Sequence, residues 1–391
     1  MISVETGLER LLADPPPGFR GRRFGLLCNP ASVDRRLRHA RFLLRERFGK
    51  GLRALFSPQH GFWAEKQDNM VESDDLVDPD LGIPVFSLYG KTRIPSRGML
   101  AGLDLLLVDL QDVGTRVYTF ASTLAHCLEA AGAAGIPVVV LDRPNPLGGE
   151  AVEGNLLRPA CASFVGRFPL PMRHGMTFAE LARWIAGPGG IACEVGWIAM
   201  RGWSRRFTFP QTGLPWVPPS PNLPTFAAAR VYPGQVLWEG TPLSEGRGTT
   251  QPFELFGAPF LDLRALASRF PEGSLPGVHL RPVVFEPTAN KWRGRPCRGF
   301  QLHVTDPEAY RPYGTTLRLL QAVVAEHPRE FAWRPPPYEY EFERLPIDLL
   351  IGDGEVRRRL EALEPVERLE ASWREELEDF QEASRAFHLY P

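Results

Sequence analysis

Five short apolar runs in the first half of the chain each end in a cluster of polar residues. Runs of this length, bounded by Gly or Pro and separated by helix-like stretches, are typical of buried parallel strands. In open parallel sheets, ligands bind in the crevice beyond the carboxyl ends of the strands. We therefore expect the clusters to meet at one sheet edge and to form an active site there. The runs and their clusters are Phe24–Cys28 with Asn29-Pro30, Leu52–Phe56 with Ser57-Pro58-Gln59-His60-Gly61, Pro84–Leu88 with Tyr89-Gly90-Lys91, Leu103–Leu110 with Gln111-Asp112-Val113-Gly114, and Ile136–Leu141 with Asp142-Arg143-Pro144-Asn145-Pro146.

Helix-like stretches alternate with these runs. Asp34–Phe48 is amphipathic and Phe120–Ala134 is rich in helix formers, while Thr177 and Glu180 form a capping box ahead of a further helix. Ala192–Met200 has the composition of another strand. This repetition predicts an α/β fold with a Rossmann-like, mostly parallel sheet and helices on both faces. No Gly-x-Gly-x-x-Gly follows the first strand, so the sequence does not support a dinucleotide. We expect no cofactor.

A proline-rich segment separates this pattern from the rest of the chain. Gly213–Thr225 has five prolines in thirteen positions, which excludes a helix interior or a central strand. It is either a linker or an ordered loop that lines a site. The residues beyond it predict a smaller C-terminal α+β auxiliary domain. We place the domains at residues 1–226 and 227–391, with the active-site cleft near their junction. The elements expected in the second domain are strands at Val278–Phe285 and Gly299–Thr305 and helices near Thr316–Glu326 and Pro365–Ala383.

Composition narrows the class of protein. The chain has 391 residues, of which 43% are hydrophobic and 23% charged, and its net charge is −1. A near-neutral chain argues against nucleic acid as a partner, and no apolar run is long enough to predict a membrane span. The five cysteines are scattered, and the N-terminus shows no secretory signal, so a cytoplasmic protein with reduced thiols is expected. The sequence does not determine the oligomeric state.

Three loops carry the candidate chemistry. Gln59–Glu72 offers two carboxylates among aromatic residues, and apolar surroundings can raise a carboxyl pKa towards that of a general acid. Ser244–Thr250 places Glu and Arg between glycines that allow a ligand to approach closely. Asp142–Pro146 is held rigid by two prolines, which suits a positioning role. The alternatives are, in turn, a solvated loop, a structural ion pair and a capped turn.

Two further features leave alternatives open. His174 is either a ligand contact or a core histidine. Asp109 and Asp112 flank the end of the most apolar strand, and one of them is expected to face the crevice because side chains alternate along a strand. The histidines show no His-Glu-x-x-His spacing, so no metal site is predicted.

Together these loops resemble a bacterial family once known only as a domain of unknown function and now associated with NamZ-type exo-β-N-acetylmuramidases. The resemblance covers nearly the whole chain, with its motifs in the same order. The matching motifs are Asn29-Pro30-Ala31-Ser32, Ser57-Pro58-Gln59-His60-Gly61, Ser87-Leu88-Tyr89-Gly90-Lys91-Thr92, Asp109-Leu110-Gln111-Asp112-Val113-Gly114, Leu141-Asp142-Arg143-Pro144-Asn145-Pro146, Pro171-Met172-Arg173-His174-Gly175-Met176-Thr177, Pro219-Ser220-Pro221-Asn222, Glu239-Gly240-Thr241, Ser244-Glu245-Gly246-Arg247-Gly248-Thr249-Thr250 and His303-Val304-Thr305-Asp306.

The resemblance implies an exo-acting glycoside hydrolase that releases N-acetylmuramic acid from the non-reducing end of peptidoglycan fragments, as in cell-wall recycling. The expected partner is thus a muramic-acid-containing saccharide. One departure stands at Gln59, where many members carry Glu in a Pro-Glu-His-Gly motif. A neutral amide cannot transfer the catalytic proton as a carboxyl group does. The acid role must then pass to Glu65 or Glu72, or the substrate has changed.

Glycoside hydrolysis requires a carboxylic acid and usually a second carboxylate. We predict Glu65 or Glu72 as the acid and Glu245 as the second carboxylate, with His60 and Tyr89 assisting. The lactyl carboxylate of the substrate suits a planar guanidinium. The predicted substrate-binding residues are Arg143, Arg173 and Arg247 for that carboxylate, together with Asn29, Gln59, Asp112, Asp142, Asn145, His174 and Asn222.

For these residues to meet, the second domain must reach the sheet. We predict that Gly240–Thr250 folds back over the carboxyl edge of the sheet, with Asn222 on the wall of the cleft. Two other functions are weighed: a non-catalytic binder of cell-wall sugars that has lost its acid, and a metal-assisted hydrolase using His60, His174 and one of the two aspartates near Gln111.

Overall fold

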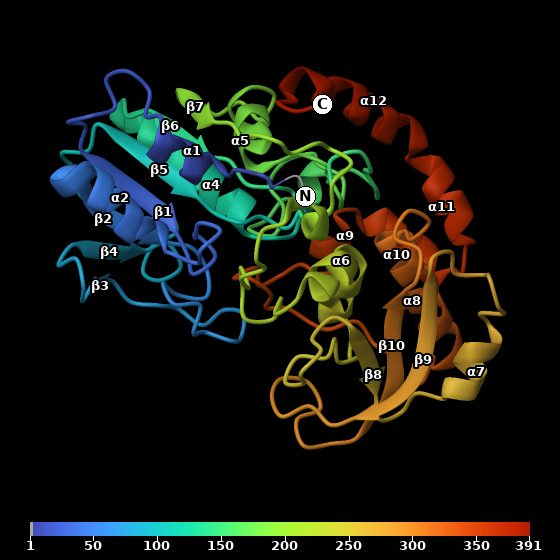
Figure 1. The fold of residues 1–391 in the computed structure, drawn as a ribbon. Helices are drawn as coiled ribbons and strands as arrows, with labels where there is room; N and C mark the ends of the chain where they lie inside the picture. The colour runs from blue at the N-terminus through green and yellow to red at the C-terminus, as the bar shows by residue number, and fades with distance from the viewer. Residues whose placement is uncertain (1–2) are drawn as a thin grey trace.

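The computed structural model describes residues 3–391 and contains two separate sheets (Figure 1). The first has seven strands in the order β3-β4-β2-β1-β5-β6-β7. All neighbours in it are parallel except β3 and β4. Each of the five strands predicted from the apolar runs is present, with ends shifted by no more than two residues. The strands are β1 Phe24–Cys28, β2 Leu52–Ser57, β3 Leu76–Val77, β4 Pro84–Ser87, β5 Leu105–Asp109, β6 Val138–Leu141 and β7 Val195–Ile198.

The strand order is that of a doubly wound sheet. From β1 the chain moves outward through β2 to β4, then crosses to β5 and moves outward on the other side through β6 and β7. Ligands of such sheets bind where the direction reverses, here between β1 and β5. The helices of this part are α1 Gly7–Ala13, α2 Ala40–Phe48, α3 Arg97–Leu100, α4 Phe120–Ala134 and α5 Phe178–Ala186, with 3-10 helices η1 Gly49–Gly51, η2 Pro159–Cys161 and η3 Phe209–Thr212.

Helices cover both faces of this sheet, which confirms the predicted architecture. Successive residues of a strand point to opposite faces. Leu26 and Leu107 accordingly pack with α1 and α2 in one buried cluster, whereas Leu27 and Leu106 pack with α4 and α5 in another. Burial on both faces is the reason that the central residues of these strands are apolar.

The helix starts follow from their capping residues. Helix α5 begins after Thr177, which forms the predicted capping box with Glu180. Helix α2 begins at Ala40 rather than at the predicted Asp34, because Asp34 accepts backbone N–H bonds in a turn and His39 supplies the cap. A side chain that satisfies turn amides competes with the helix for them.

The second part is a smaller domain with its own antiparallel sheet, in the order β8-β10-β9. The predicted strands and the predicted helix near residue 316 are present, but the charged segment after Pro365 forms two helices that break at the buried Trp373. The strands are β8 Leu255–Ala258, β9 Val278–Phe285 and β10 Cys297–Val304. The helices are α6 Phe226–Gln235, α7 Leu263–Ser268, α8 Pro312–Glu326, α9 Pro346–Ile351, α10 Gly354–Glu361, α11 Val366–Ser372 and α12 Arg374–Ser384, with 3-10 helices η4 Val236–Gly240 and η5 Arg385–Phe387.

The chain ends against the first domain (Figure 1). Phe380 of α12 packs on Trp184 of α5, with ring centroids 5.1 Å apart. Tyr390 Oη donates a hydrogen bond to Asp142 Oδ2 at 2.6 Å. The largest buried apolar cluster also runs from α4 and α5 into α8 and β10. The two domains therefore share one core, which fixes the position of the loops of one domain relative to those of the other. None of the helices between residues 3 and 391 is both long and apolar enough to cross a membrane.

Candidate active site

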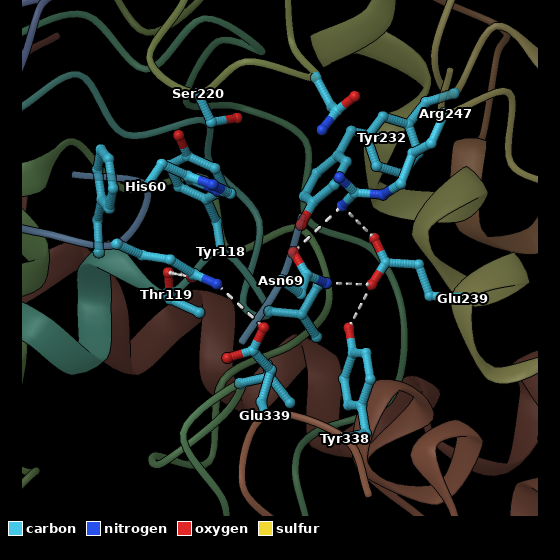
Figure 2. Close-up of a pocket in the computed structure, with 16 residues that line it drawn as sticks. His60, Asn69, Tyr118, Thr119, Ser220, Tyr232, Glu239, Arg247, Tyr338 and Glu339 are labelled. Atoms are coloured by element: carbon cyan, nitrogen blue, oxygen red, sulfur yellow. Dashed lines mark hydrogen bonds and ion pairs between the residues drawn. The ribbon is translucent and has the colours of Figure 1, made fainter. Parts of the chain in front are cut away.

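A pocket lies where the two domains meet, beyond the carboxyl ends of β2 and β5 (Figure 2). Both domains and the proline-rich segment contribute to its walls. That segment is thus an ordered loop, and it is held in part by the Asn29 amide, which donates to Pro219 O at 2.8 Å. The lining residues are Gln59, His60, Asn69, Val117, Tyr118, Thr119, Phe120, Val165, Ser220, Asn222, Tyr232, Glu239, Arg247, Phe253, Tyr338 and Glu339.

Gln59 follows β2 and sits next to the start of α4. Thr119 Oγ1 donates to Gln59 Oε1 at 2.6 Å, which fixes the orientation of the amide. The amide nitrogen therefore faces the second domain, where it donates to Glu339 Oε1 at 3.0 Å and to Tyr89 Oη at 3.2 Å. Gln59 thus contacts a carboxyl group that is distant in the sequence.

Glu339 brings that carboxyl group into the pocket from the segment between α8 and α9. Its side chain is buried, and its other oxygen accepts a hydrogen bond from Tyr89 Oη at 2.5 Å. Burial raises the pKa of Glu339, and the hydrogen bonds from Tyr89 and Gln59 offset this only in part. The residue is shifted towards its protonated form.

Glu239 is the second buried carboxyl group in the pocket. It accepts hydrogen bonds from Arg247 Nη2 at 2.7 Å, Tyr338 Oη at 2.6 Å and Asn69 Nδ2 at 2.9 Å. Burial acts to raise its pKa, but the charge of Arg247 and the hydrogen bonds from Arg247 and Tyr338 outweigh burial and lower the pKa of Glu239. The pocket therefore holds one carboxyl group that favours the proton and one that favours the ionised state.

A chain of buried charges supports Glu239 from behind. Arg247 Nε lies 3.2 Å from Glu245 Oε1, and Glu245 Oε2 lies 2.7 Å from Lys291 Nζ. Two acids and two bases give this group a formal charge of zero. Glu245, predicted as a catalytic carboxylate, is absent from the pocket lining and is engaged by both bases.

His60 and Tyr89 both stay neutral. His60 has a positive φ of 78°, and its Nδ1 lies 2.8 Å from the carbonyl oxygen of Lys66. Burial lowers the pKa of His60 to about 4 despite that carbonyl. Burial and the nearby Glu339 carboxylate raise the pKa of Tyr89. A neutral imidazole and a phenol can orient partners here by hydrogen bonding.

The predicted convergence of the two domains is present. Asn222 Nδ2 donates to Gln67 O at 2.8 Å, and Arg247 Nη1 approaches the same oxygen at 3.4 Å. The segment Gly240–Thr250 therefore reaches the loop after β2, as predicted. Four of the predicted site residues line the pocket: Gln59, His60, Asn222 and Arg247.

The two acids predicted as the proton donor lie outside the pocket. The Glu65 side chain is 45% exposed and lies 3.8 Å from Lys66 Nζ. Glu72 is also exposed, and the Tyr340 hydroxyl is 3.4 Å from it. Their loop presents both carboxylates to water, which solvates the charge. The buried environment expected for an acid surrounds Glu339 instead.

Three predicted substrate-binding residues hold the scaffold instead of lining the pocket. Asp142 accepts hydrogen bonds from Thr177 Oγ1 at 2.8 Å and from the backbone at the start of α5. Arg143 makes a bidentate pair with Asp109 at 2.6 and 2.9 Å. Asn145 binds the backbone before α5. Polar groups buried at the end of a strand need such partners, and each of these residues finds them within the scaffold.

Three further predicted residues also lie outside the lining. Asp112 accepts a hydrogen bond from Gly114 N at 2.6 Å, and His174 Nε2 is 3.7 Å away. Burial raises the pKa of Asp112 to about 7 and lowers the pKa of His174 to about 3. Arg173 donates to the Leu147 carbonyl and lines a separate groove. His174 is therefore a core histidine. Within residues 3–391, no group of three His, Cys, Asp or Glu side chains is arranged to hold a metal.

The sequence interpretation missed Glu239, Tyr338, Glu339 and Asn69. Glu239 stands in the Glu-Gly-Thr motif, but no apolar strand precedes it to mark a sheet edge. Glu339 lies between two tyrosines after three prolines, in a segment with no strand or helix signal. The available signal for Glu339 was its position between two aromatic residues in a segment that prolines make rigid.

Comparison with known proteins places the chain in a family. The model described as exo-β-N-acetylmuramidase NamZ, N-terminal, matches residues 24–227, and the C-terminal model of the same name matches residues 230–390. The peptidoglycan β-N-acetylmuramidase NamZ of Bacillus subtilis (strain 168) is 40% identical over 387 residues, which cover 99% of this chain and 91% of that protein.

Two solved structures of DUF1343 family proteins from Bacteroides fragilis NCTC 9343 are also similar. One has a TM-score of 0.89 at 32% identity and covers 100% of both chains. The other has a TM-score of 0.77 at 27% identity and covers 99% of both. The two-domain architecture is therefore shared along the whole length. With the two family models spanning both domains, the chain belongs to the NamZ exo-β-N-acetylmuramidase family.

Proposed function

We propose that this chain is an exo-acting glycoside hydrolase that releases N-acetylmuramic acid from the non-reducing end of peptidoglycan fragments. Membership of the family and the peptidoglycan-cleaving relative support the reaction. The observation that carries the proposal is the pocket between the domains, where two buried carboxyl groups have opposite pKa shifts. Pairs of this kind supply the acid and the carboxylate that glycoside hydrolysis requires.

The walls of the pocket suit a sugar with an anionic substituent. Tyr118, Tyr232 and Tyr338 offer aromatic surface and hydroxyl groups (Figure 2). Arg247 pairs with Glu239 and Glu245 but lines the pocket. Its other contacts, to Gln67 O and Asn69 Oδ1, are long at 3.4 Å, so part of its donor capacity faces the pocket. We assign it to the lactyl carboxylate of the substrate, and Asn222 to the sugar hydroxyls. Arg143 and Arg173 are engaged elsewhere and drop out of this role.

A non-catalytic sugar binder is not favoured. That alternative was motivated by Gln59, whose amide cannot serve as an acid. Two carboxyl groups remain in the pocket, and one of them contacts Gln59 directly. The loss of a carboxyl group at one position therefore does not leave the pocket without an acid.

A cytoplasmic location and a part in cell-wall recycling belong to the same proposal. All five cysteines have free thiols, and four of them are buried. Unpaired thiols are the usual state in a reducing compartment. Fragments that enter the cell for re-use are then the expected substrates.

The test is incubation with two disaccharides of opposite order. One carries N-acetylmuramic acid at the non-reducing end, and the other carries N-acetylglucosamine there. We expect free N-acetylmuramic acid from the first and no cleavage of the second, measured by mass spectrometry. Binding of the first without release, or equal cleavage of both, would refute the proposal.

A further inference from the structure

We infer that Glu339, a residue of the second domain, is the general acid of this protein, and that Gln59 positions it across the domain junction. The inference rests on the proposed function and deepens it. The acid would thus come from the second domain and lie within hydrogen-bond distance of the residue that follows β2.

Geometry places the two positions next to each other. The Gln59 amide nitrogen is 3.0 Å from Glu339 Oε1, although 280 residues separate them in the chain. A carboxyl group therefore lies one hydrogen bond from the amide. Catalytic groups must converge around one reacting centre, and they can do so from segments that are far apart in the sequence.

The surroundings hold Glu339 in one orientation. Thr119 fixes the amide of Gln59, as described above, and Gln59 then binds one carboxyl oxygen. Tyr89 binds the other, and Met70 N donates to the Tyr89 hydroxyl at 3.2 Å. Glu339 itself has a positive φ of 46°, a conformation that non-glycine residues adopt when packing imposes it. The carboxyl group is pre-organised for proton transfer.

The electrostatic setting favours a proton on Glu339. Burial raises its pKa, and the negative charge of Glu239 adds to this effect. Gln59 donates an uncharged hydrogen bond, which orients Glu339 and lowers its pKa, but this bond only partly offsets the effect of burial. Glu239 is the poorer candidate, because the charge and hydrogen bond of Arg247 lower its pKa. Both donors to Glu339 are uncharged, and they do not overcome the effect of burial.

The glycosidic oxygen takes the proton of Glu339 as the bond between it and the anomeric carbon breaks, and the bonding electron pair leaves with that oxygen. The leaving group departs as a neutral alcohol. A water oxygen forms the new bond to the anomeric carbon, and a carboxylate of the pair accepts the proton that water loses. The ionised Glu239 counters the positive charge that develops on the sugar ring.

The experiment compares two leaving groups. An aryl glycoside with an acidic phenol needs little protonation, whereas the natural disaccharide needs a full proton transfer. Glu339→Gln should lose about 10²–10⁴-fold of kcat/KM on the disaccharide, the usual worth of general acid catalysis, and much less on the aryl glycoside. Glu343→Gln, with an exposed side chain on the same segment, is the matched control and should keep both activities.

The reciprocal exchange tests the part assigned to Gln59. Gln59→Glu combined with Glu339→Gln keeps one carboxyl group and one amide in contact, so it should regain at least about tenfold of the disaccharide activity lost by Glu339→Gln. Gln59→Glu alone should stay active and extend activity to higher pH, because two adjacent carboxyl groups hold a shared proton more tightly. A double variant no better than Glu339→Gln would overturn the role of Gln59.

Each remaining outcome decides one question. Full disaccharide activity in Glu339→Gln, or equal losses on both substrates, overturns Glu339 as the acid and leaves the muramidase proposal standing. If the unmodified protein releases no sugar from either substrate, the proposed function fails and the acid assignment falls with it. Melting temperatures and binding of the intact disaccharide by each variant separate a lost proton donor from a lost fold.

Discussion

Lys291 offers a direct test of the charge network behind Glu239. Its ammonium lies 2.7 Å from Glu245 Oε2 and also donates to Trp238 O at 2.7 Å and Thr241 O at 3.2 Å. Lys291→Met keeps the length of the side chain and removes the charge. The four buried groups, Glu239, Glu245, Arg247 and Lys291, would then sum to −1 instead of zero.

The expected loss of stability follows from the burial of that surplus negative charge. The Glu245 side chain is only 2% exposed, so it cannot regain water when Lys291 is removed. Breaking a buried pair costs about 3–5 kcal/mol, because it leaves an uncompensated charge. Burial lowers the pKa of Lys291 even though Glu245 opposes this shift. The intact pair is therefore expected to contribute little net stability, and most of the loss comes from the orphaned carboxylate.

The assay is urea unfolding of a double-mutant cycle, followed by tryptophan fluorescence and circular dichroism. Glu245→Gln with Lys291→Met removes both charges and should be less destabilised than the sum of the two single variants by about 2–3 kcal/mol. Additivity within about 0.5 kcal/mol would refute the network. The same double variant tests Glu245 in catalysis: a stable protein with normal kcat excludes a catalytic role, whereas a stable, inactive one restores it.

The pH dependence of activity provides a second test of Lys291→Met. The charge of Lys291 contributes to the lowered pKa of Glu239, after burial and Arg247. Its removal should raise that pKa and move the acidic limb of the kcat/KM profile to higher pH, since Glu239 acts in its ionised form. An unmoved acidic limb would contradict that role for Glu239.

Three further predictions follow from the placement of other groups. Glu65→Gln and Glu72→Gln should each keep full turnover, because both side chains lie outside the pocket; a large loss in either would return the acid to that loop. Burial raises the pKa of Asp142 from 3.8 to about 7, so the folded state binds this proton more tightly and the free energy of unfolding falls as pH rises through that range. Asp142→Asn should reduce the difference in unfolding free energy between pH 5 and pH 8 by about 2–3 kcal/mol, and an unchanged difference would show that Asp142 does not titrate there. Exhaustive chelation should leave turnover unchanged, because no metal-ligating group of three side chains is found within residues 3–391; activity restored by one added metal would contradict this.

The sequence by itself determined the first domain to a large extent. Strands such as β1 and β5 are buried on both faces, so apart from the terminal Asp109 their residues are apolar, and the run itself marks them. The capping box at Thr177 is equally local, because its partners lie within one helical turn. The sheet edge that carries the site follows from these strands, since parallel strands end at the same edge. Each of these inferences depends on neighbours within a few residues.

Only the tertiary structure decided which polar residues form the site. Glu65 and Glu339 are both acids beside aromatic residues in the sequence, yet one lies in water and the other is buried against Gln59. Asp142 and Arg143 stand at the expected strand end, but their charges are used within the scaffold. Burial and charge pairing set the pKa of a carboxyl group, and both depend on contacts between residues that are far apart in the chain. The packing of the second domain onto the sheet edge therefore selected the acid, and no local pattern carries that information.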